Sequence, residues 1–362
     1  MKIAIVALTK NGCQTALRLA ENLPDNEEIC LYLKAEHTAG PGEINAAVKP
    51  FGQKLRELIA EIYADYQAFV MIMAAGIVFR TFAPYAEHKA KDPAVVVIDE
   101  AGRFAISLLS GHLGGANALA HQAAAALGAT PVITTATDVN NMIAFDNVAK
   151  ANGCAIENIE AVQFISGAMV NGQTVGVAAD LPLVAEGDSA YHIYADYAEA
   201  AQNALANNVI ISSRLLPALG EHTLWLRPKN LLLGIGCRRG VPLERLEQAL
   251  LDFMKSRGYS MLSLKAMASI DLKSDEEGLL GLSQKYNIPF ITYPAEALKE
   301  IGNKTGTSDF VAAVTGTPSV SQAAALAAAG AGGKTLVEKT VYPGITLSLA
   351  ETPQTIIIKQ DY

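Results

Sequence analysis

The chain has 362 residues, of which 51% are hydrophobic and 18% are charged, and its formal net charge is −8. The length suggests about two to three domains, and the apolar content excludes an intrinsically disordered chain. The acidic balance argues against a nucleic-acid partner. The longest nearly apolar run, Ala68 to Phe79, is shorter than the roughly 20 residues that a membrane-spanning helix needs.

The chain begins with a short apolar segment, Ile3 to Leu8, which runs directly into the polar loop Thr9 to Gly12. A secretory signal would be longer, so we expect a first strand and a cytoplasmic protein. The four cysteines, among them Cys13 and Cys237, form no C-x-x-C pair, and the six histidines are scattered. This pattern predicts free thiols and no metal held by the protein's own side chains.

The first part of the chain alternates between continuous apolar strands and amphipathic helices. That alternation is typical of a parallel sheet covered by helices on both faces. We therefore predict an α/β domain with a doubly wound, mostly parallel sheet over residues 1–142. The predicted strands are Ile3–Leu8, Ile29–Leu33, Ala68–Ala74, Ala94–Ile98 and Pro131–Thr135, and the predicted helices are Gln14–Asn22, Lys54–Tyr66 and Ala116–Leu127.

The pattern changes after residue 142. Residues 143–228 contain short strand signals separated by Asn, Gly and Asp, which predicts a smaller α/β middle domain. Residues 229–362 begin with the strand Leu231–Ile235 and continue with alternating helices and strands. They are predicted to form a C-terminal α/β domain.

Three segments resemble nucleotide-binding motifs, but each lacks the required context. The run Gly234–Gly240 is one residue too long for the dinucleotide fingerprint. The run Gly333–Thr335 ends like a phosphate-binding loop, yet a predicted helix precedes it and a predicted strand follows, which is the reverse order. Val95–Glu100 resembles the acidic strand of an ATPase but has no such loop to serve. We interpret these segments as ordinary loops and a strand end.

Polar loops follow several predicted strands of the first domain. In open α/β sheets ligands bind beyond the carboxyl ends of the strands, and glycines let the backbone approach a ligand closely. Taken singly, Thr135–Asp138 is also readable as a helix cap, and His112 as an ordinary loop histidine. Together the loops predict one polar cluster for a substrate that carries carboxylates. The cluster combines Lys91, Asp92, Asp99, Glu100, Arg103, His112, Asn117 and Asp138. The other candidates in these loops are Gly76, Arg80, Gly111, Gly114, Gly115, Thr134 and Thr135.

The C-terminal domain contains a second candidate anion site. Arg238 and Arg239 follow a strand in a turn flanked by glycines, and arginine binds carboxylates through two parallel hydrogen bonds. The alternative is a pair of solvated surface arginines. The other candidates at this site are Gly236, Ser269, Asp271, Thr317 and Ser319.

Several of these segments resemble a known family. They are Ala74–Ile77, Asp92–Glu100, Leu108–Asn117, Val132–Asp138 and Gly234–Gly240. Taken together they resemble the cobalt-precorrin-5A hydrolases of anaerobic cobalamin biosynthesis, and the resemblance covers nearly the whole chain. The runs Ser-Gly-His-Leu-Gly-Gly-Ala-Asn and Gly-Ile-Gly-Cys-Arg-Arg-Gly are its most specific parts.

The resemblance implies a hydrolase that acts on a cobalt-bearing tetrapyrrole. Such an enzyme opens the ring-A δ-lactone of cobalt-precorrin-5A with water, releases acetaldehyde and leaves cobalt-precorrin-5B. The cobalt then belongs to the substrate, and no cofactor of the protein's own is implied. The substrate is a large polyanion, which suits the scattered cationic and N–H sites.

Lactone hydrolysis needs a base for the attacking water and donors for the developing oxyanion. We expect His112 to be the base, with Glu100 and Asp99 as the next candidates. Lys91 and the amides of Gly111–Gly115 are expected to hold the oxyanion. The other residues of the two candidate sites are expected to bind the substrate.

Two other functions remain open at this point. One is a tetrapyrrole carrier without catalysis, and the other is a nucleotide-dependent enzyme that would rest on Lys334 and Asp99. We expect the cobalt tetrapyrrole as the binding partner, with hand-over to neighbouring enzymes of the cobalamin pathway. Neither nucleic acid nor a membrane is expected as a partner, and a homodimer is left open.

Overall fold

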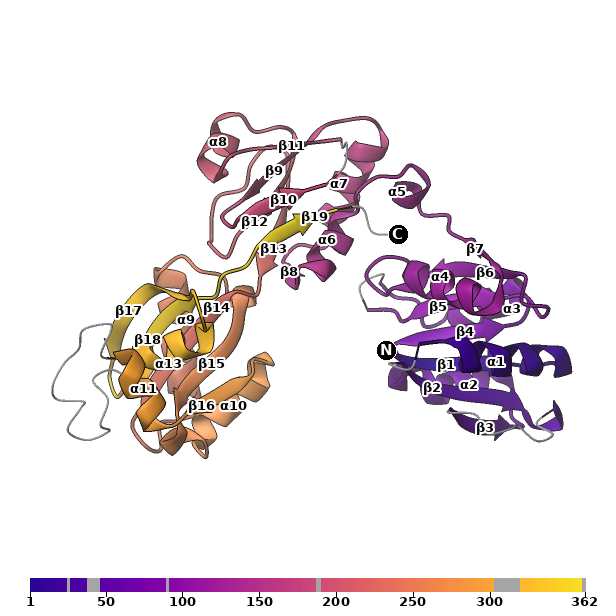
Figure 1. The fold of residues 1–362 in the computed structure, drawn as a ribbon, viewed down its shortest axis with the longest axis horizontal. Coiled ribbons are helices and arrows are strands. Elements are labelled where there is room, and N and C mark those ends of the chain that lie inside the picture. Colours follow the sequence, from indigo (N-terminus) through magenta and orange to yellow (C-terminus); the bar gives the residue numbers. More distant parts are fainter. Residues whose placement is uncertain (25–26, 38–45, 89–90, 187–189, 303–319, 360–362) are drawn as a thin grey trace. The chain divides into compact units, whose positions relative to one another are not determined.

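The computed structural model describes residues 1–24, 27–37, 46–88, 91–186, 190–302 and 320–359 (Figure 1). Within these residues the chain forms two compact units, residues 1–147 and residues 148–359. The first unit contains a seven-stranded sheet, and the second contains two five-stranded sheets and a two-stranded ladder. The predicted α/β class is confirmed, whereas the predicted domain boundaries after residues 142 and 228 stay predictions. No helix of the described residues is long and apolar enough to cross a membrane.

The first unit is built on β1 (Lys2–Ala7), β2 (Glu28–Lys34), β3 (Ala47–Phe51), β4 (Ala68–Ile72), β5 (Ala94–Ile98), β6 (Phe104–Leu109) and β7 (Thr130–Val132). Their order in the sheet is β3-β2-β1-β4-β5-β6-β7. The first five strands run parallel to one another. Every residue of β4 and β5 is buried, which explains why both strands are continuously apolar.

Helices cover both faces of this sheet. Helices α1 (Lys10–Asn22) and α4 (Ala116–Leu127) pack on one face, and α2 (Leu55–Ile62) and α3 (Ala75–Phe82) pack on the other (Figure 1). Alternate residues of β1 belong to the two cores, because side chains alternate along a strand. The first unit is therefore doubly wound, and α4 has the bounds that the sequence predicts. Two short helices follow the sheet in the chain. α5 (Ala136–Val139) belongs to the first unit, and α6 (Phe145–Ala151) continues into the second unit at Val148.

The last two strands of this sheet run in the opposite direction to the others. β6 pairs antiparallel with β5, so that Ile98 lies opposite Ala105 and Val95 lies opposite Leu109. β7 runs parallel to β6. The carboxyl ends of β6 and β7 therefore lie at the edge where β5 begins, roughly 15 Å from the edge where β4 and β5 end. Neither β3 nor β6 is among the predicted strands, and the reversal at β6 decides which polar loops meet.

The second unit begins with a sheet of the strands β8 (Cys154–Ile156), β9 (Val175–Ala179), β11 (Tyr191–Ile193), β12 (Asn207–Ile211) and β13 (His222–Pro228). Their order is β11-β9-β12-β13-β8, and β8 pairs antiparallel with β13 while the other pairs are parallel. Helices α7 (Ala161–Val170) and α8 (Tyr197–Gln202) connect these strands. Arg227 of β13 is buried and donates to the carbonyl oxygens of Ser212 and Arg214, so it fixes the segment that follows β12.

The second five-stranded sheet contains β14 (Leu231–Cys237), β15 (Leu264–Ile270), β16 (Phe290–Tyr293), β17 (Lys334–Tyr342) and β18 (Ile345–Glu351). Its order is β16-β15-β14-β18-β17, with β14, β15 and β16 parallel and β18 antiparallel to both of its neighbours. The helices of this part are α9 (Leu243–Ser256), α10 (Glu277–Tyr286), α11 (Ala295–Gly302) and α13 (Val320–Ala329). Because α13 ends at Ala329 and β17 begins at Lys334, the run Gly333–Thr335 leads from a helix into a strand, as predicted.

A two-stranded ladder joins the two parts of the second unit. β10 (Leu183–Ala185) pairs in parallel with β19 (Ile356–Ile358), which follows the C-terminal sheet in the chain (Figure 1). A backbone hydrogen bond of 2.8 Å from Ser260 to Ser213 adds a second link. These links explain why residues 148–359 form a single compact unit.

Candidate functional site

The segment between β6 and α4 is a tight loop with two left-handed backbone positions. Ser110 has a φ of 57°, and Gly115, which caps α4, has a φ of 91°. The carbonyl oxygens of Ser110 and Gly111 accept hydrogen bonds from the first amides of α4. The loop thus caps the helix with its own carbonyl groups, and it places His112 just beyond the carboxyl end of β6.

The glycines of this loop are required by its own packing. A Cβ atom at Gly111 would lie 2.7 Å from Oδ1 of Asn117, and one at Gly114 would lie 2.7 Å from the backbone oxygen of Ser110. The Gly115 amide donates to the carbonyl oxygen of His112 at 3.0 Å. These contacts account for the glycines without a ligand. Their expected roles in holding the substrate and the oxyanion stay predictions.

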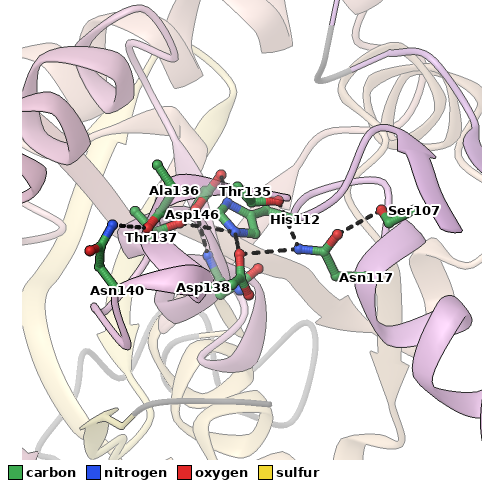
Figure 2. Close-up of polar contacts among 10 residues, drawn as sticks. Ser107, His112, Asn117, Thr135, Ala136, Thr137, Asp138, Asn140 and Asp146 are labelled. Carbon is green, nitrogen blue, oxygen red and sulfur yellow. Dashed lines mark hydrogen bonds and ion pairs between the residues drawn. The ribbon is translucent and has the colours of Figure 1, made fainter. Parts of the chain in front are cut away.

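His112 lies between two carboxylates (Figure 2). Its Nε2 is 2.7 Å from Oδ2 of Asp138 on α5, and its Nδ1 is 3.4 Å from Oδ2 of Asp146 on α6. The side chains of His112 and Asp146 are 13% and 5% exposed, whereas that of Asp138 is 27% exposed. Asp138 is therefore the member of this trio that solvent reaches most readily.

Asn117 binds the same carboxylate from α4. Its Nδ2 donates to Oδ2 of Asp138 and to Oγ1 of Thr135, at 3.2 Å each. Its Oδ1 accepts a hydrogen bond of 2.6 Å from Ser107 of β6. The buried amide of Asn117 thus holds Asp138 in place (Figure 2). We call the connected set the His112 network; it consists of Ser107, His112, Asn117, Thr135, Thr137, Asp138 and Asp146.

The two carboxylates determine the charge of the His112 ring. Burial is the largest single effect on the pKa and lowers it, but the hydrogen bonds and charges of Asp146 and Asp138 together outweigh it. They raise the pKa of His112 from 6.5 to about 9. The ring is therefore an imidazolium at neutral pH, with both N–H groups facing carboxylates. A protonated ring cannot take a proton from water, so His112 acts as a base only after losing its own.

The raised pKa makes the stability of the first unit depend on pH. A group whose pKa rises on folding stabilises the folded state fully below its unfolded pKa, and this stabilisation is lost as the pH rises through the folded pKa. For His112 the window runs from 6.5 to about 9 and corresponds to at most about 3 kcal/mol. We expect the free energy of unfolding of the wild type to exceed that of His112→Gln at pH 6, and the difference to shrink by pH 10. Urea unfolding followed by circular dichroism measures it.

A matched control for this prediction is His121→Gln, because His121 lies exposed on the same helix α4 as Asn117. Its effect on the free energy of unfolding is expected to be small, because the side chain is exposed. If His112→Gln shows a constant difference from the wild type between pH 6 and pH 10, the ring is not held charged by the network.

The remaining candidates of the first unit do not join the His112 network. Gly76 and Arg80 lie on α3 beyond the carboxyl end of β4, at the edge opposite His112. Lys91 is exposed and lies before the start of β5, at the same edge as His112, and Thr134 is exposed beyond β7. The expectation of one polar cluster is wrong, because the reversal at β6 divides its members between the two edges of the sheet.

Asp99 shapes the turn between β5 and β6. Its Oδ1 accepts hydrogen bonds of 2.7 Å from the amides of both Arg103 and Phe104. Burial raises the pKa of Asp99, but these bonds and the Arg103 charge outweigh it and hold the pKa below its ordinary value. The neighbouring Glu100 contributes its carbonyl oxygen to Thr15 at 2.8 Å. The turn thus gives the Asp99 carboxylate a structural role, and the catalytic roles expected of Asp99 and Glu100 stay predictions.

The C-terminal candidates also separate. A cavity of about 470 Å³ opens where β14 and β15 end, and Gly236, Arg238 and Ser269 contribute to its lining. Arg239 is directed elsewhere, since it binds Asp275 at 2.8 Å and a backbone carbonyl oxygen at 2.9 Å. The structure thus distinguishes two arginines that the sequence treats alike.

The remaining candidates of the C-terminal site are Ser269, Asp271, Thr317 and Ser319. Ser269 is fully buried and donates to the carbonyl oxygen of Ile235 at 2.6 Å. Asp271 is exposed, and its Oδ1 accepts from the following amide at 2.8 Å. Thr317 and Ser319 lie outside the described residues.

Three residues of these sites carry little signal in the sequence. Asp146 is an acidic residue in the first turn of a helix, a common position that gives no hint of a histidine partner. Lys339 and Tyr342 line the cavity from β17, about 100 residues after Arg238 in the chain. Only the strand pairing brings them to the same edge of the sheet as Arg238.

The metal and thiol predictions concern the whole chain. All four cysteines are free, which confirms the predicted thiols. In the described ranges no group of three or more His, Cys, Asp or Glu side chains is arranged to hold a metal ion. The absence of a cofactor stays a prediction.

Three family models match consecutive parts of the chain. "Cobalamin synthesis G N-terminal" matches residues 57–138, "Cobalamin biosynthesis central region" matches residues 143–228, and "Cobalamin synthesis G C-terminus" matches residues 231–350. The first match contains the His112 loop, and the third contains the strands around the cavity.

Two curated relatives align over nearly the full length. The cobalt-precorrin-5A hydrolase of Priestia megaterium is 34% identical over 365 residues, which cover 97% of this chain and 95% of the relative. That of Salmonella typhimurium is 36% identical over 353 residues, which cover 96% and 97%. A solved structure of a cobalamin biosynthesis protein G homologue from Sulfolobus solfataricus is 21% identical, with 97% of both chains covered and a TM-score of 0.38.

Proposed function

Because the chain belongs to the cobalt-precorrin-5A hydrolase family, we propose that it opens the ring-A δ-lactone of cobalt-precorrin-5A with water, releasing acetaldehyde and giving cobalt-precorrin-5B. The observation that carries this proposal is the alignment of the whole chain with two hydrolases of that name. The His112 network supplies the acid–base groups that such a reaction needs.

The reaction consumes one water and breaks two bonds of the substrate. The water oxygen attacks the lactone carbonyl carbon, the acyl–oxygen bond breaks, and the ring-A acetate becomes a free carboxylate. The released oxygen remains on the methyl-bearing meso carbon. When the bond between that carbon and the macrocycle breaks, the hydroxyl proton is released to solvent, the carbon leaves as acetaldehyde and the electron pair stays on the conjugated ring.

Within the His112 network we assign the proton transfers to Asp138 and His112. Asp138 is more exposed than His112 and Asp146, and its carboxylate takes the proton of the attacking water. The imidazolium of His112 contacts the same carboxylate at 2.7 Å, and it supplies through Asp138 the proton that the departing lactone oxygen takes. Asp146 and Asn117 are positioning residues, because they hold the ring charged and the carboxylate oriented.

In this proposal cobalt enters and leaves with the tetrapyrrole, and the protein uses no cofactor of its own. The enzyme works in the cytoplasm and passes its product to the next enzyme that handles the macrocycle. Residues at the other edge of the first sheet, including Glu100, take no part in the proton transfers.

The test is an anaerobic incubation of the purified protein with cobalt-precorrin-5A, with acetaldehyde measured across a range of pH. We expect protein-dependent release, with kcat/KM level from about pH 6.5 to 8 and falling as the pH passes about 9, where His112 loses its proton. Binding of the substrate without release of acetaldehyde would contradict the hydrolase activity and favour a tetrapyrrole carrier without catalysis. A kcat/KM that rises toward pH 9 would instead make the neutral His112 ring the base.

A further inference from the structure

The cavity at the carboxyl ends of β14 and β15 has the features of a binding site for an amphiphilic anion. Its volume of about 470 Å³ falls in the range of small-molecule sites, roughly 300–1,000 Å³. Apolar side chains form much of its wall, among them Ile270, Val341 and Tyr342. Such a wall suits the flat edge of a hydrophobic ring system.

The charged groups of this cavity are all cationic. Arg238, Lys273 and Lys339 line it, and no carboxylate appears among its described lining residues. Lys273 is compensated, since its Nζ lies 3.0 Å from Oε2 of the buried Glu276. Among the ion pairs of the described chain, none involves Arg238 or Lys339. Two cations are therefore available to a ligand.

The backbone explains why Arg238, and not Arg239, belongs to the cavity. The Arg238 amide donates to the carbonyl oxygen of Gly344 at 2.9 Å, which continues the pairing of β14 with β18. A Cβ at Gly344 would lie 3.7 Å from Cδ of Arg238, so the arginine stem lies along this glycine. Arg239 is held by Asp275 and lines a separate depression beside α9 and α10.

We propose that this cavity binds a carboxylate-bearing edge of the macrocyclic substrate, with Arg238 and Lys339 as the anion-binding groups. The inference rests on the proposed function, because that function defines the ligand as an apolar ring fringed by acetate and propionate groups. It goes beyond that function by assigning substrate affinity to a site in the second unit, whereas the acid–base groups lie in the first.

The first test measures equilibrium binding of a stable cobalt corrinoid with free peripheral carboxylates, cobyrinic acid, to the full chain. We expect Arg238→Gln and Lys339→Gln each to weaken binding about tenfold, and the double variant about a hundredfold. Arg239→Gln is the matched control and is expected to bind within twofold of the wild type. The corrinoid with its carboxylates converted to amides is expected to bind the wild type at least tenfold more weakly.

Two outcomes of this test overturn the proposal. One is unchanged binding by the double variant, and the other is an equal loss in Arg239→Gln, which would indicate a general effect of surface charge. The acetaldehyde assay separates this failure from failure of the proposed function. If the wild type releases acetaldehyde and the double variant keeps its KM, the cavity assignment fails alone.

A second measurement needs no substitution. Cys237 lines the cavity as a partly exposed thiol, and burial raises its pKa, so it reacts slowly with iodoacetamide. Cobyrinic acid is expected to slow its alkylation at least fivefold. Cys154 on β8, the other partly exposed thiol, is the internal reference and is expected to react at an unchanged rate. Equal protection of both thiols, or of neither, contradicts binding in this cavity.

Discussion

Replacing His112 with alanine is expected to lower kcat for acetaldehyde release by about 10²–10⁴-fold, the range typical of lost acid–base catalysis. The substitution removes the proton donor and also leaves Asp138 and Asp146 facing each other without the cation between them. The ring is 13% exposed and lies inside the network. Bulk water therefore cannot fill the space that alanine leaves unless the loop moves. The measurement is the steady-state rate of acetaldehyde release at saturating substrate, at a pH near 7.

The control for this variant is His121→Ala, which changes an exposed histidine on α4. Its rate is expected to match the wild type. A second variant, Asp146→Asn, keeps the shape of the network but removes one of the charges that raise the His112 pKa. The fall of kcat/KM at high pH should then begin at a lower pH. If His112→Ala retains near-normal turnover, the network is structural and the acid–base groups lie elsewhere.

The second large effect is expected from Gly234→Ala in β14, which should destabilise the second unit by about 3 kcal/mol or more. A Cβ at Gly234 would overlap the backbone oxygen of Ser321 and would lie 2.6 Å from its carbonyl carbon and 2.9 Å from the Ala325 amide. These atoms belong to the backbone of α13, so no side chain can rotate away. The helix must shift from the sheet, and urea unfolding followed by the fluorescence of Trp225 reports the loss.

Gly281→Ala on α10 is the matched control for that substitution. A Cβ there would meet only the flexible end of Leu243, at 3.4 Å or more. Because alanine favours a helix over glycine, this change is expected to be neutral or to stabilise by about 0.5–1 kcal/mol. A loss in Gly234→Ala no larger than roughly 0.5 kcal/mol, the size typical of a surface substitution, would mean that α13 does not press on β14.

Much of the fold can be predicted from the sequence because its buried strands and helices leave strong periodic signals. The helix Ala116–Leu127 and the strand Ala94–Ile98 have the predicted bounds. Strand direction leaves no such signal. β6 is only partly buried along most of its length, and its antiparallel course depends on a turn that Asp99 closes. A local pattern therefore could not show that Asp99 and His112 lie at opposite edges.

The candidate sites, like the fold, could be predicted from the sequence only in part. His112, Asn117 and Asp138 form one network because β6 and β7 run parallel and end at the same edge. Asp146 and Lys339 could not be found this way, because each enters its site through tertiary packing of a distant segment. Arg238 and Arg239 differ in the surface that each side chain lies along: Arg238 lines the cavity, whereas Arg239 binds Asp275. Two neighbouring residues of the same type give no sequence signal for this difference.

The ladder between β10 and β19 bears on how the second unit is synthesised and folded. Its two strands are about 170 residues apart in the chain. Closing so large a loop costs conformational entropy before the contacts that compensate for this cost have formed. During translation β10 therefore cannot pair with β19 until the C-terminal sheet has left the ribosome. We infer that this ladder is the last part of the unit to gain protection in pulsed hydrogen exchange, and that shortening the chain before Ile356 would leave β10 as an open edge prone to pair with another molecule.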